Sequence, residues 1–340
     1  SRLAQFKQAG INRVSIGVQS FDEQDLQFLG RKHSIAEANR AIQIAQDLFH
    51  DRVSVDLMFG TERHARDETV WEHVLSEAMK LQLNHISLYQ LTIEKYTQFY
   101  KWLKKGEIAL PDEECSERLY QKAIDVCASH GLSQYEISNF AKPGFECRHN
   151  VQYWNSGDYL GMGPGAHSRI TDGSNNRFSM VQVMKPEDWI SEIELSSSGN
   201  DHESNKSKNI SKNGEQPLSN LCSALGNIKS EYTDHEQRLE EVFMMGLRLL
   251  HRGVSEQELS FHMNRIVTFE QVLNNNVLRQ LQEHNFIVIE SVRSPDCSPT
   301  TTASSTTTTT TLTATTEDRR MRVTRKGQGV LDELLATLLS

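Results

Sequence analysis

VSVDLMF, residues Val53–Phe59, is a short run of branched and apolar residues that includes one carboxylate, Asp56. Such a run predicts a strand buried on both faces. Similar runs lie on either side of it along the chain, at 12–18 (NRVSIGV) and 85–91 (HISLYQL). Amphipathic helices are predicted between the three runs, over 34–49 and 67–81. Alternating strands and helices predict parallel pairing with right-handed crossovers, and therefore an α/β fold.

The carboxyl ends of these predicted strands are where functional groups are expected. Parallel α/β folds place their active sites at that edge of the sheet. Here the edge carries Gln19 and Ser20, then Gly60, then Thr92 and Glu94. Three strands are typical of part of a larger barrel or open sheet. The first ten residues, SRLAQFKQAG, are typical of the last turns of a helix, so we expect that residues preceding Ser1 have been lost.

Composition narrows the class of partner. The formal net charge of −9 argues against a broad nucleic-acid or acidic-membrane surface. No apolar run approaches the roughly 20 residues that a bilayer-spanning helix needs, so no transmembrane segment is predicted, although peripheral membrane contact remains open. Five cysteines lie at 115, 127, 147, 222 and 297, with no CxxC pair and no iron–sulfur spacing. Their odd number and irregular spacing predict reduced thiols rather than a disulfide framework.

The stretch 135–167, YEISNFAKPGFECRHNVQYWNSGDYLGMGPGAH, is rich in polar and aromatic side chains and ends in a glycine cluster. Neither a helix nor a strand period explains its pattern. Loops that hold such groups on a scaffold usually contact a ligand. The alternative is an irregular core loop whose polar groups bond to one another.

The C-terminal part predicts a second folding unit. A stretch over 196–232 is dominated by Ser, Asn and Lys, so it is predicted to be a disordered insert. Beyond it, three helices, a β-hairpin and a final helix are expected, with a Thr-rich insert over 298–316 at the hairpin's tip. That order is typical of a winged helix. The many acidic residues of this part of the chain argue against nucleic-acid binding.

Four motifs, taken in their order along the chain, resemble the motifs of one protein family. They are GINRVSIGVQSFDEQDLQFLGRKHS, VSVDLMFG, HISLYQLTIE and the 135–167 stretch. They resemble the HemW branch of the radical S-adenosylmethionine (SAM) proteins, relatives of oxygen-independent coproporphyrinogen III oxidase. The likeness is dense over about residues 5–195 and spaced over 234–340. It implies a mitochondrial location for a eukaryotic protein and a cytoplasmic one for a bacterial protein.

The resemblance implies a division of the chain. The expected fold class is α/β: the C-terminal strands of a partial radical SAM (β/α) barrel, followed by a mainly α, winged-helix-like domain. The expected segments are 1–110 (barrel), 111–195 (a family-specific region), 196–232 (insert) and 233–340 (the winged-helix-like domain).

The family carries SAM and a [4Fe-4S] cluster, and the resemblance places part of the SAM site here. It falls on Gln19, Arg31 and Asp56, with Thr92 a weaker candidate. Asp56 could accept hydrogen bonds from a ribose or amino group, and Arg31 could pair with the methionine carboxylate. The alternatives are a surface salt bridge for Arg31 and a buried, hydrogen-bonded strand residue for Asp56.

The haem-chaperone branch is recognised by HNxxYW, which reads here His149, Asn150, Tyr153 and Trp154 at its named positions. The resemblance implies haem binding and delivery of haem to receiving proteins. An imidazole is a good axial iron ligand, and Tyr153 and Trp154 could stack on a porphyrin. Cys147 is a second candidate ligand. The alternative for His149 is a supporting or core histidine.

Two departures from the family pattern bear on activity. The CxxxCxxC cluster motif is absent, and the family's GLPGQT turn is replaced by Gly60 followed by TERHARDE. His33 and His64 are expected in solvent, and His167 is expected to cap a loop. We expect this chain to be inactive as a radical enzyme as given. Haem delivery is the favoured function, against an oxidase of porphyrin biosynthesis and a non-catalytic partner-binding remnant.

Overall fold

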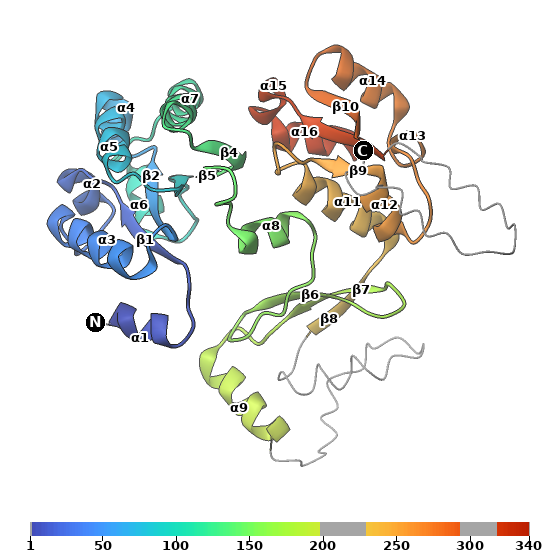
Figure 1. Cartoon of the computed structure of the whole chain (residues 1–340), viewed down its shortest axis with the longest axis horizontal. Coiled ribbons are helices and arrows are strands. Elements are labelled where there is room, and N and C mark those ends of the chain that lie inside the picture. Colours follow the sequence, from blue (N-terminus) through green and yellow to red (C-terminus); the bar gives the residue numbers. More distant parts are fainter. Residues whose placement is uncertain (1, 198–228, 293–317, 340) are drawn as a thin grey trace, which may run out of the picture. The chain divides into compact units, whose positions relative to one another are not determined.

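The computed structural model describes residues 2–197, 229–292 and 318–339. The chain divides into two compact units (Figure 1), each of which is described by itself. The first comprises Ser1–Arg148 with Leu249–His251, and the second His149–Arg248 with Arg252–Ser340. The Thr-rich insert expected over 298–316 lies outside the described residues, as does most of the insert expected over 196–232.

The first unit is built on a five-stranded sheet with the order β1-β2-β3-β5-β4. The three predicted strands are confirmed as β1 (Val14–Gln19), β2 (Val53–Phe59) and β3 (His85–Gln90), and they pair in parallel. The short strands β5 (Asn139–Ala141) and β4 (Ser133–Glu136) add an antiparallel edge. The sheet is open, and the predicted α/β class is confirmed.

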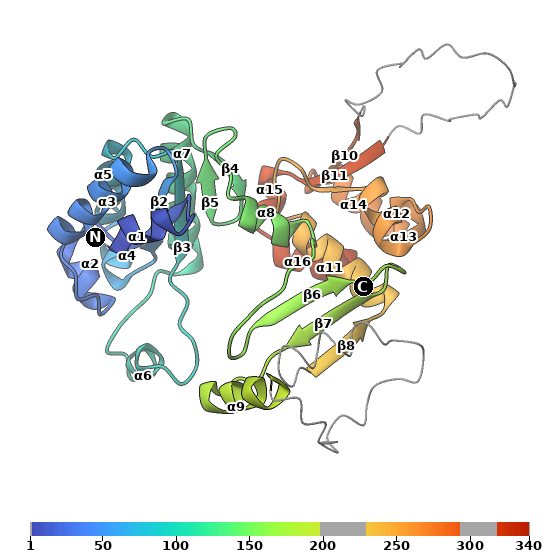
Figure 2. The ribbon, with the colours of Figure 1, turned by 60° about the horizontal axis from the view of Figure 1, so that its bottom comes forward.

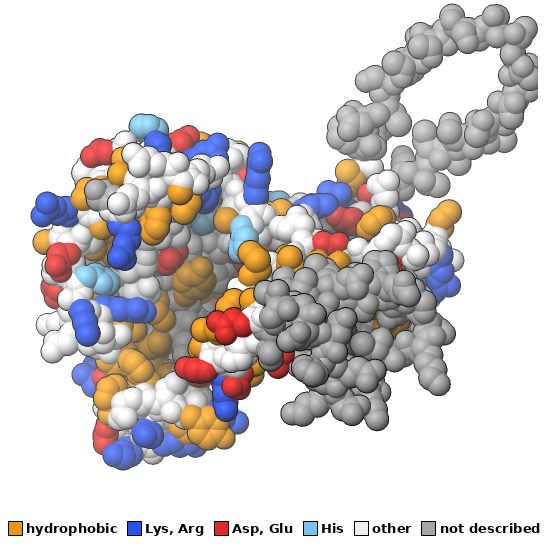
Figure 3. Space-filling view, turned by 90° about the horizontal axis from the view of Figure 1, so that it is seen from below, with side chains coloured by type: hydrophobic (Ala, Val, Ile, Leu, Met, Phe, Trp, Pro, Cys, Tyr) orange, Lys and Arg blue, Asp and Glu red, His pale blue; other side chains and the backbone are white. Residues whose placement is uncertain are grey.

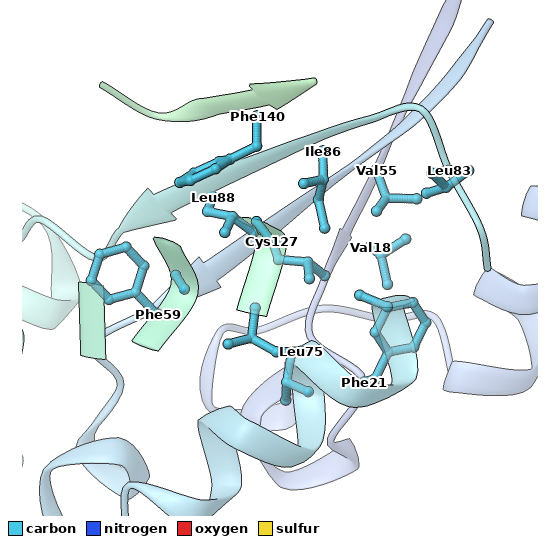
Figure 4. Packing of buried hydrophobic residues seen from close by; sticks show 14 of the residues in the cluster. Val18, Phe21, Val55, Phe59, Leu75, Leu83, Ile86, Leu88, Cys127 and Phe140 are labelled. Atoms are coloured by element: carbon cyan, nitrogen blue, oxygen red, sulfur yellow. The ribbon is translucent and has the colours of Figure 1, made fainter. Parts of the chain in front are cut away.

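Helices pack on one face of this sheet and form the core. They are α3 (Ile35–Phe49), α5 (Thr69–Lys80) and α7 (Glu113–Ser129). Figure 4 shows Val55, Ile86 and Leu88 from the strands meeting Leu75 and Cys127 from the helices. The apolar residues at alternate strand positions point to the helices, because side chains alternate between the faces of a strand. A capping box of Ser34 and Glu37 begins α3, the helix expected over 34–49.

Shorter helices complete the first unit. They are α1 (Arg2–Gln8), α2 (Glu23–Phe28), α4 (Glu62–Arg66) and α6 (Gln98–Lys105). Figure 2 shows α6 on a long loop after β3. Within 2–197, 229–292 and 318–339, no helix combines the length and apolar character needed to cross a bilayer.

The second unit contains two antiparallel sheets and a group of helices. It begins within α8 (Arg148–Trp154), and its first sheet has the order β6-β7-β8. Those strands are β6 (His167–Thr171), β7 (Arg177–Val181) and β8 (Lys229–Thr233), with α9 (Pro186–Ser197) after β7. The strand β8 thus occupies the end of the range expected to be an insert.

The C-terminal part has the predicted order of helices and hairpin. Its elements are α11 (His235–Gly246), β9 (Val254–Ser255), α12 (Glu256–Met263), α13 (Phe269–Val272), α14 (Asn275–Glu283), β10 (Ile287–Val292), β11 (Asp318–Val323), α15 (Arg325–Gln328) and α16 (Leu331–Leu338). The hairpin pairs β10 with β11, and β9 adds a third strand. The third of the three helices expected before the hairpin is divided into α13 and α14. Asn274 interrupts it, because its side chain accepts from Asn276 and Val277 N–H groups and caps α14.

Candidate functional site

The face of the first unit's sheet opposite the helices is polar. It presents Ser15, Ser54, Asp56, Ser87 and Tyr89 at the strand positions that alternate with the core. Ser54 Oγ donates to Ser15 Oγ at 2.7 Å, and Ser15 Oγ donates to Asp56 Oδ1 at 2.7 Å. Every residue of β2 is buried or half-buried, so the expectation of a buried strand is confirmed, and Asp56 on the polar side is half-buried. The Asp56 carboxylate can accept further hydrogen bonds beside the one from Ser15.

Two of the four SAM candidates lie close together. Gln19 ends β1 in a left-handed conformation (φ 71°), beside a bulge that follows Gly17. Gly17 pairs in register with Asp56, and Gln19 pairs with Leu57, so the Gln19 amide and the Asp56 carboxylate lie on neighbouring strands. A Cβ on Gly17 would come within 2.8 Å of Gln19 Nε2. The glycine thus allows the Gln19 side chain to fold back over the strand.

The other two SAM candidates are exposed. Thr92 follows β3 by two residues, where the Leu91 N–H donates to the Phe59 carbonyl at 2.8 Å. Arg31 follows α2, and its own N–H donates to the Leu26 carbonyl at 2.9 Å. No ion pair of the Arg31 guanidinium occurs among the described residues. The structure brings Gln19 and Asp56 together and leaves Arg31 and Thr92 in solvent.

The turn after β2 is ordered by a buried polar cluster around Asp25. Thr61 Oγ1 donates to Asp25 Oδ1 at 2.9 Å, and Ser20 Oγ donates to Oδ2 at 3.1 Å. His64 Nε2 lies 3.1 Å from Oδ2, while the Gly60 N–H donates to His64 Nδ1 at 3.1 Å. His64 is fully buried, so the expectation that it lies in solvent is wrong. No local sequence pattern indicates this burial, because Asp25 and His64 belong to different elements.

The charge of Asp25 is maintained by its neighbours. Burial acts to raise the pKa of this carboxyl, but its hydrogen bonds with His64, Thr61 and Ser20 lower it overall. The backbone N–H of Gly60 always donates, so His64 Nδ1 is the acceptor and Nε2 carries the proton that faces Asp25. The cluster thus fixes the conformation of the turn, although the turn lacks the proline and the glutamine of the family motif.

The segment 142–147, which we call the Cys147 segment, is held to the sheet by three side chains. Arg13 Nη1 donates to the Phe145 carbonyl at 3.1 Å. The Cys147 N–H donates to the Tyr135 hydroxyl at 3.3 Å, and that hydroxyl lies 2.9 Å from His85 Nε2. Burial, with the nearby Arg13 charge, lowers the pKa of His85 to about 3, so the imidazole is neutral. Sequence reasoning did not single out Arg13, Tyr135 or His85.

The haem candidates His149, Tyr153 and Trp154 lie on α8, at the start of the second unit. His149 is exposed, and its ring meets that of Tyr153 edge-on at 4.7 Å between centroids, one helical turn later. Tyr153 in turn meets Tyr159 at 4.5 Å. Trp154 faces the Arg248 guanidinium at 5.8 Å. The helix therefore presents an accessible imidazole flanked by aromatic rings.

Cys147 differs from the other described cysteines. It is half-buried, whereas Cys115 and Cys127 are buried, and burial raises the pKa of the Cys127 thiol to about 12. Cys222 and Cys297 lie outside the described residues. Over the described part of the chain, no three His, Cys, Asp or Glu side chains converge as metal ligands. Cys147 is thus the described thiol best able to reach a ligand.

On the face in Figure 3, Lys and Arg are scattered among acidic and apolar groups outside the grey atoms. This distribution accords with the net charge of −9.

Comparison with known proteins places the chain among relatives of one kind. No family model matches it. It is 33% identical over 343 residues to the radical S-adenosyl methionine domain-containing protein 1, mitochondrial, of Bos taurus, and 31% identical to that of Danio rerio. Both matches cover 100% of this chain, which spans only 65% and 64% of these relatives. It is also 40% identical over 170 residues to the heme chaperone HemW of Escherichia coli (strain K12), covering 50% of this chain and 43% of that protein.

A solved structure is similar in fold. The coproporphyrinogen III oxidase (HemN) of Escherichia coli, described as a radical SAM enzyme, matches with a TM-score of 0.62 at 14% identity. The match covers 99% of this chain and 66% of that protein.

Proposed function

Because the chain belongs to the HemW-like radical SAM family, we propose that it binds haem and delivers it to haem proteins. The observation that carries this proposal is the exposed His149 imidazole on α8, with Tyr153 one turn away. An imidazole that solvent reaches can ligate iron without a prior rearrangement of the core. A site on an exposed helix also buries little of the porphyrin, which suits a protein that must release its haem.

The side chains at the proposed haem site suit that ligand chemically. His149 offers a nitrogen ligand, and Tyr153 and Trp154 offer aromatic faces for the porphyrin. Cys147, half-buried and unpaired, offers a thiolate as the alternative ligand. When bound, the haem iron would take an axial ligand from one of these residues. The receiving protein would compete for the same iron.

We propose that the fold is the C-terminal part of a radical SAM barrel followed by a winged-helix-like domain. The parallel β1-β2-β3 order, with helices on one face and polar groups on the other, supports the partial barrel. The hairpin β10–β11 after α14 supports the winged helix, with the hairpin as its wing. The segment limits 1–110, 111–195, 196–232 and 233–340 remain predictions.

We propose that SAM and a [4Fe-4S] cluster belong to the intact family protein, with Gln19 and Asp56 on this chain's share of the SAM site. Their neighbouring positions and open carboxylate suit an amino or ribose hydroxyl group. Arg31 and Thr92 are exposed, and would need to close on the ligand. In the family, SAM bound to the cluster supplies radical chemistry.

The mitochondrial names of the relatives support a mitochondrial location.

A second candidate function is favoured by the HemN fold match, namely a coproporphyrinogen III oxidase-like role in porphyrin biosynthesis. A non-catalytic, partner-binding role is the third. Binding of haem distinguishes the first candidate function, haem delivery, from the other two. An oxidase binds the metal-free porphyrinogen, whereas a haem carrier binds the iron porphyrin through an axial ligand.

The test is a haem titration of wild type, His149→Ala and Cys147→Ala, with His73→Ala as an exposed helical control. We expect His149→Ala to weaken haem binding by about tenfold or more and to shift the Soret band. Cys147→Ala and His73→Ala should match wild type. Unchanged affinity and spectrum in His149→Ala would exclude this ligand, and a change confined to Cys147→Ala would assign the thiolate instead.

A further inference from the structure

A row of side chains in the second unit continues the aromatic pair of α8. His149 meets Tyr153 edge-on at 4.7 Å between ring centroids, and Tyr153 meets Tyr159 edge-on at 4.5 Å. Tyr159 lies between α8 and β6, and it forms an antiparallel bridge with Arg169 of β6. The N–H of each residue donates to the carbonyl of the other, at 2.8 and 3.0 Å. Residues that lie directly opposite in such a bridge carry their side chains on the same face, so Arg169 lies beside the Tyr159 ring.

The charge of Arg169 acts on the Tyr159 hydroxyl. Burial raises the pKa of this hydroxyl, and the Arg169 charge, which is the next largest influence, opposes that rise. This accords with a guanidinium close to the ring. The row therefore begins with an imidazole, continues with two aromatic rings and ends with a cation.

Arg169 is the accessible member of a group of three arginines. Its side chain is 27% exposed, whereas Arg177 and Arg238 are buried. The Nε atoms of Arg169 and Arg177 donate to the two oxygens of one carboxylate, Glu241, at 3.0 and 3.2 Å. Arg177 also pairs with Asp158 at 3.1 Å, while the hydrogen bonds of Arg238 go to neutral acceptors. In these contacts, two carboxylates thus serve three guanidiniums.

The Arg169 guanidinium can bind a further acceptor. Its Nε donates to Glu241 and its Nη1 donates to the Ser168 carbonyl at 3.2 Å, whereas Nη2 makes no hydrogen bond within the described part of the chain. A guanidinium forms its strongest hydrogen bonds with carboxylates. Because Glu241 occupies only Nε, a second carboxylate can bind at the terminal nitrogens without displacing it.

We propose that Tyr159 and Arg169 complete the haem site, with Arg169 binding a haem propionate. This inference rests on the proposed haem function, and it names the residues that recognise the carboxylate-bearing edge of the porphyrin. With the iron at His149, the ring would lie along Tyr153 and Tyr159, and a propionate would reach Arg169 beyond them. All four residues belong to the second unit.

The experiment compares haem with haem dimethyl ester, which keeps the iron and the ring but has both carboxylates esterified. Dissociation constants and Soret maxima are measured at pH 7 for wild type, Arg169→Met, Arg169→Lys and the control Arg252→Met. Arg252 is an exposed arginine of the same unit that is likewise ion-paired with a carboxylate, that of Glu258.

We expect wild type to bind haem about tenfold more tightly than the ester. Arg169→Met should lose that preference by weakening haem binding alone, with an unchanged Soret band, because the iron ligand is untouched. Arg169→Lys should keep part of the preference, since lysine keeps the charge but loses the planar fork. Arg252→Met should behave as wild type.

The aromatic row is tested by two variants of Tyr159. Tyr159→Leu should weaken haem and ester binding alike, because both ligands have the same ring. Tyr159→Phe keeps the aromatic face and should match wild type. If Tyr159→Leu folds, as judged by its melting curve, and binds both ligands as wild type does, Tyr159 does not belong to the site.

Three further outcomes overturn the assignment of Arg169. Equal weakening of haem and ester binding by Arg169→Met would make Arg169 a structural residue only. If wild type binds haem and ester alike, the propionate site is wrong while the proposed haem function stands. If wild type binds neither, the proposed function itself fails. Should Arg169→Met not fold, Arg169→Gln decides by the same comparison, because glutamine removes the charge but keeps a hydrogen-bond donor.

Discussion

At the scale of single residues, buried neutral histidines set the response of this protein to acid. His262 is buried on α12, where Arg238 Nη2 donates to its Nδ1 at 3.2 Å. Burial, then the charges of Arg238 and Arg177, lower the pKa of His262 to about 4, although Asp158 opposes this. His85 responds in the same way, with its pKa lowered to about 3.

This predicts a loss of stability on acidification. An unfolded histidine has a pKa of about 6.5. Between pH 6.5 and about 4 the unfolded chain therefore binds a proton at position 262 that the folded chain does not. The free energy of unfolding then falls by about 1.4 kcal/mol per pH unit for this group. His262→Asn keeps an acceptor for Arg238 but cannot take up the proton.

Urea unfolding at pH 7, 6 and 5 measures the effect. The acid slope of His262→Asn should be smaller than that of wild type by about 1.4 kcal/mol per unit, and exposed His73→Ala should leave it unchanged. Equal slopes for wild type and His262→Asn would show that His262 is already charged in the folded state.

The role of an individual side chain could be predicted only where its contacts are local in sequence or follow from the pattern of strands. Gln19 was expected at the carboxyl edge of the sheet and Asp56 within the second strand, and the two residues lie on neighbouring strands. Arg13 and His85 could not be chosen, because their significance depends on Phe145 and Tyr135, which are distant in sequence and close in the fold.

At the scale of elements, the glycine before β9 tests how closely two strands approach. Gly253 has φ 63°, and a Cβ there would overlap the Met321 carbonyl on β11. Gly106, which ends α6, has φ 70° with nothing within 4 Å of its would-be Cβ. Both positions disfavour a side chain for backbone reasons, but only Gly253 adds a collision with a neighbouring strand.

We therefore expect unequal costs for the same substitution. Gly106→Ala should lower the free energy of unfolding by about 1–2 kcal/mol, the cost of a left-handed alanine. Gly253→Ala should exceed about 3 kcal/mol, because the strands must also move apart. Urea unfolding gives both values, and amide hydrogen exchange should place the second loss in β9 and β11. Similar costs for the two variants would mean that β9 and β11 separate freely.

Elements were predictable where a periodic pattern was long or a cap was specific. The three parallel strands follow from their apolar runs, and α3 follows from its capping box. The break between α13 and α14 was missed, because Asn274 acts as a cap only when the chain already turns there. The strand β9 was also missed, since two residues carry no period of their own.

At the scale of the whole molecule, cysteine spacing limits the cofactors. The printed sequence has five cysteines and no triplet at cluster spacing. We expect anaerobic reconstitution with iron and sulfide to yield no stoichiometric [4Fe-4S] cluster, as judged by metal analysis and absorbance near ~400 nm. Haem binding should be unaffected by the same treatment. A full complement of iron and sulfide, lost in Cys147→Ala, would show that ligands from distant parts of the chain assemble a cluster.

The side chains that converge on Asp25 constrain how this protein can diverge from its relatives. Replacing Asp25 alone leaves the Ser20 and Thr61 hydroxyls without their acceptor. Replacing His64 alone leaves the Gly60 N–H without its acceptor. Each single step loses stability that only a later change could restore. The histidine-centred turn and the family's proline-containing turn are therefore alternative solutions to one folding problem. We therefore expect Asp25, Thr61 and His64 to differ together, rather than singly, among related proteins.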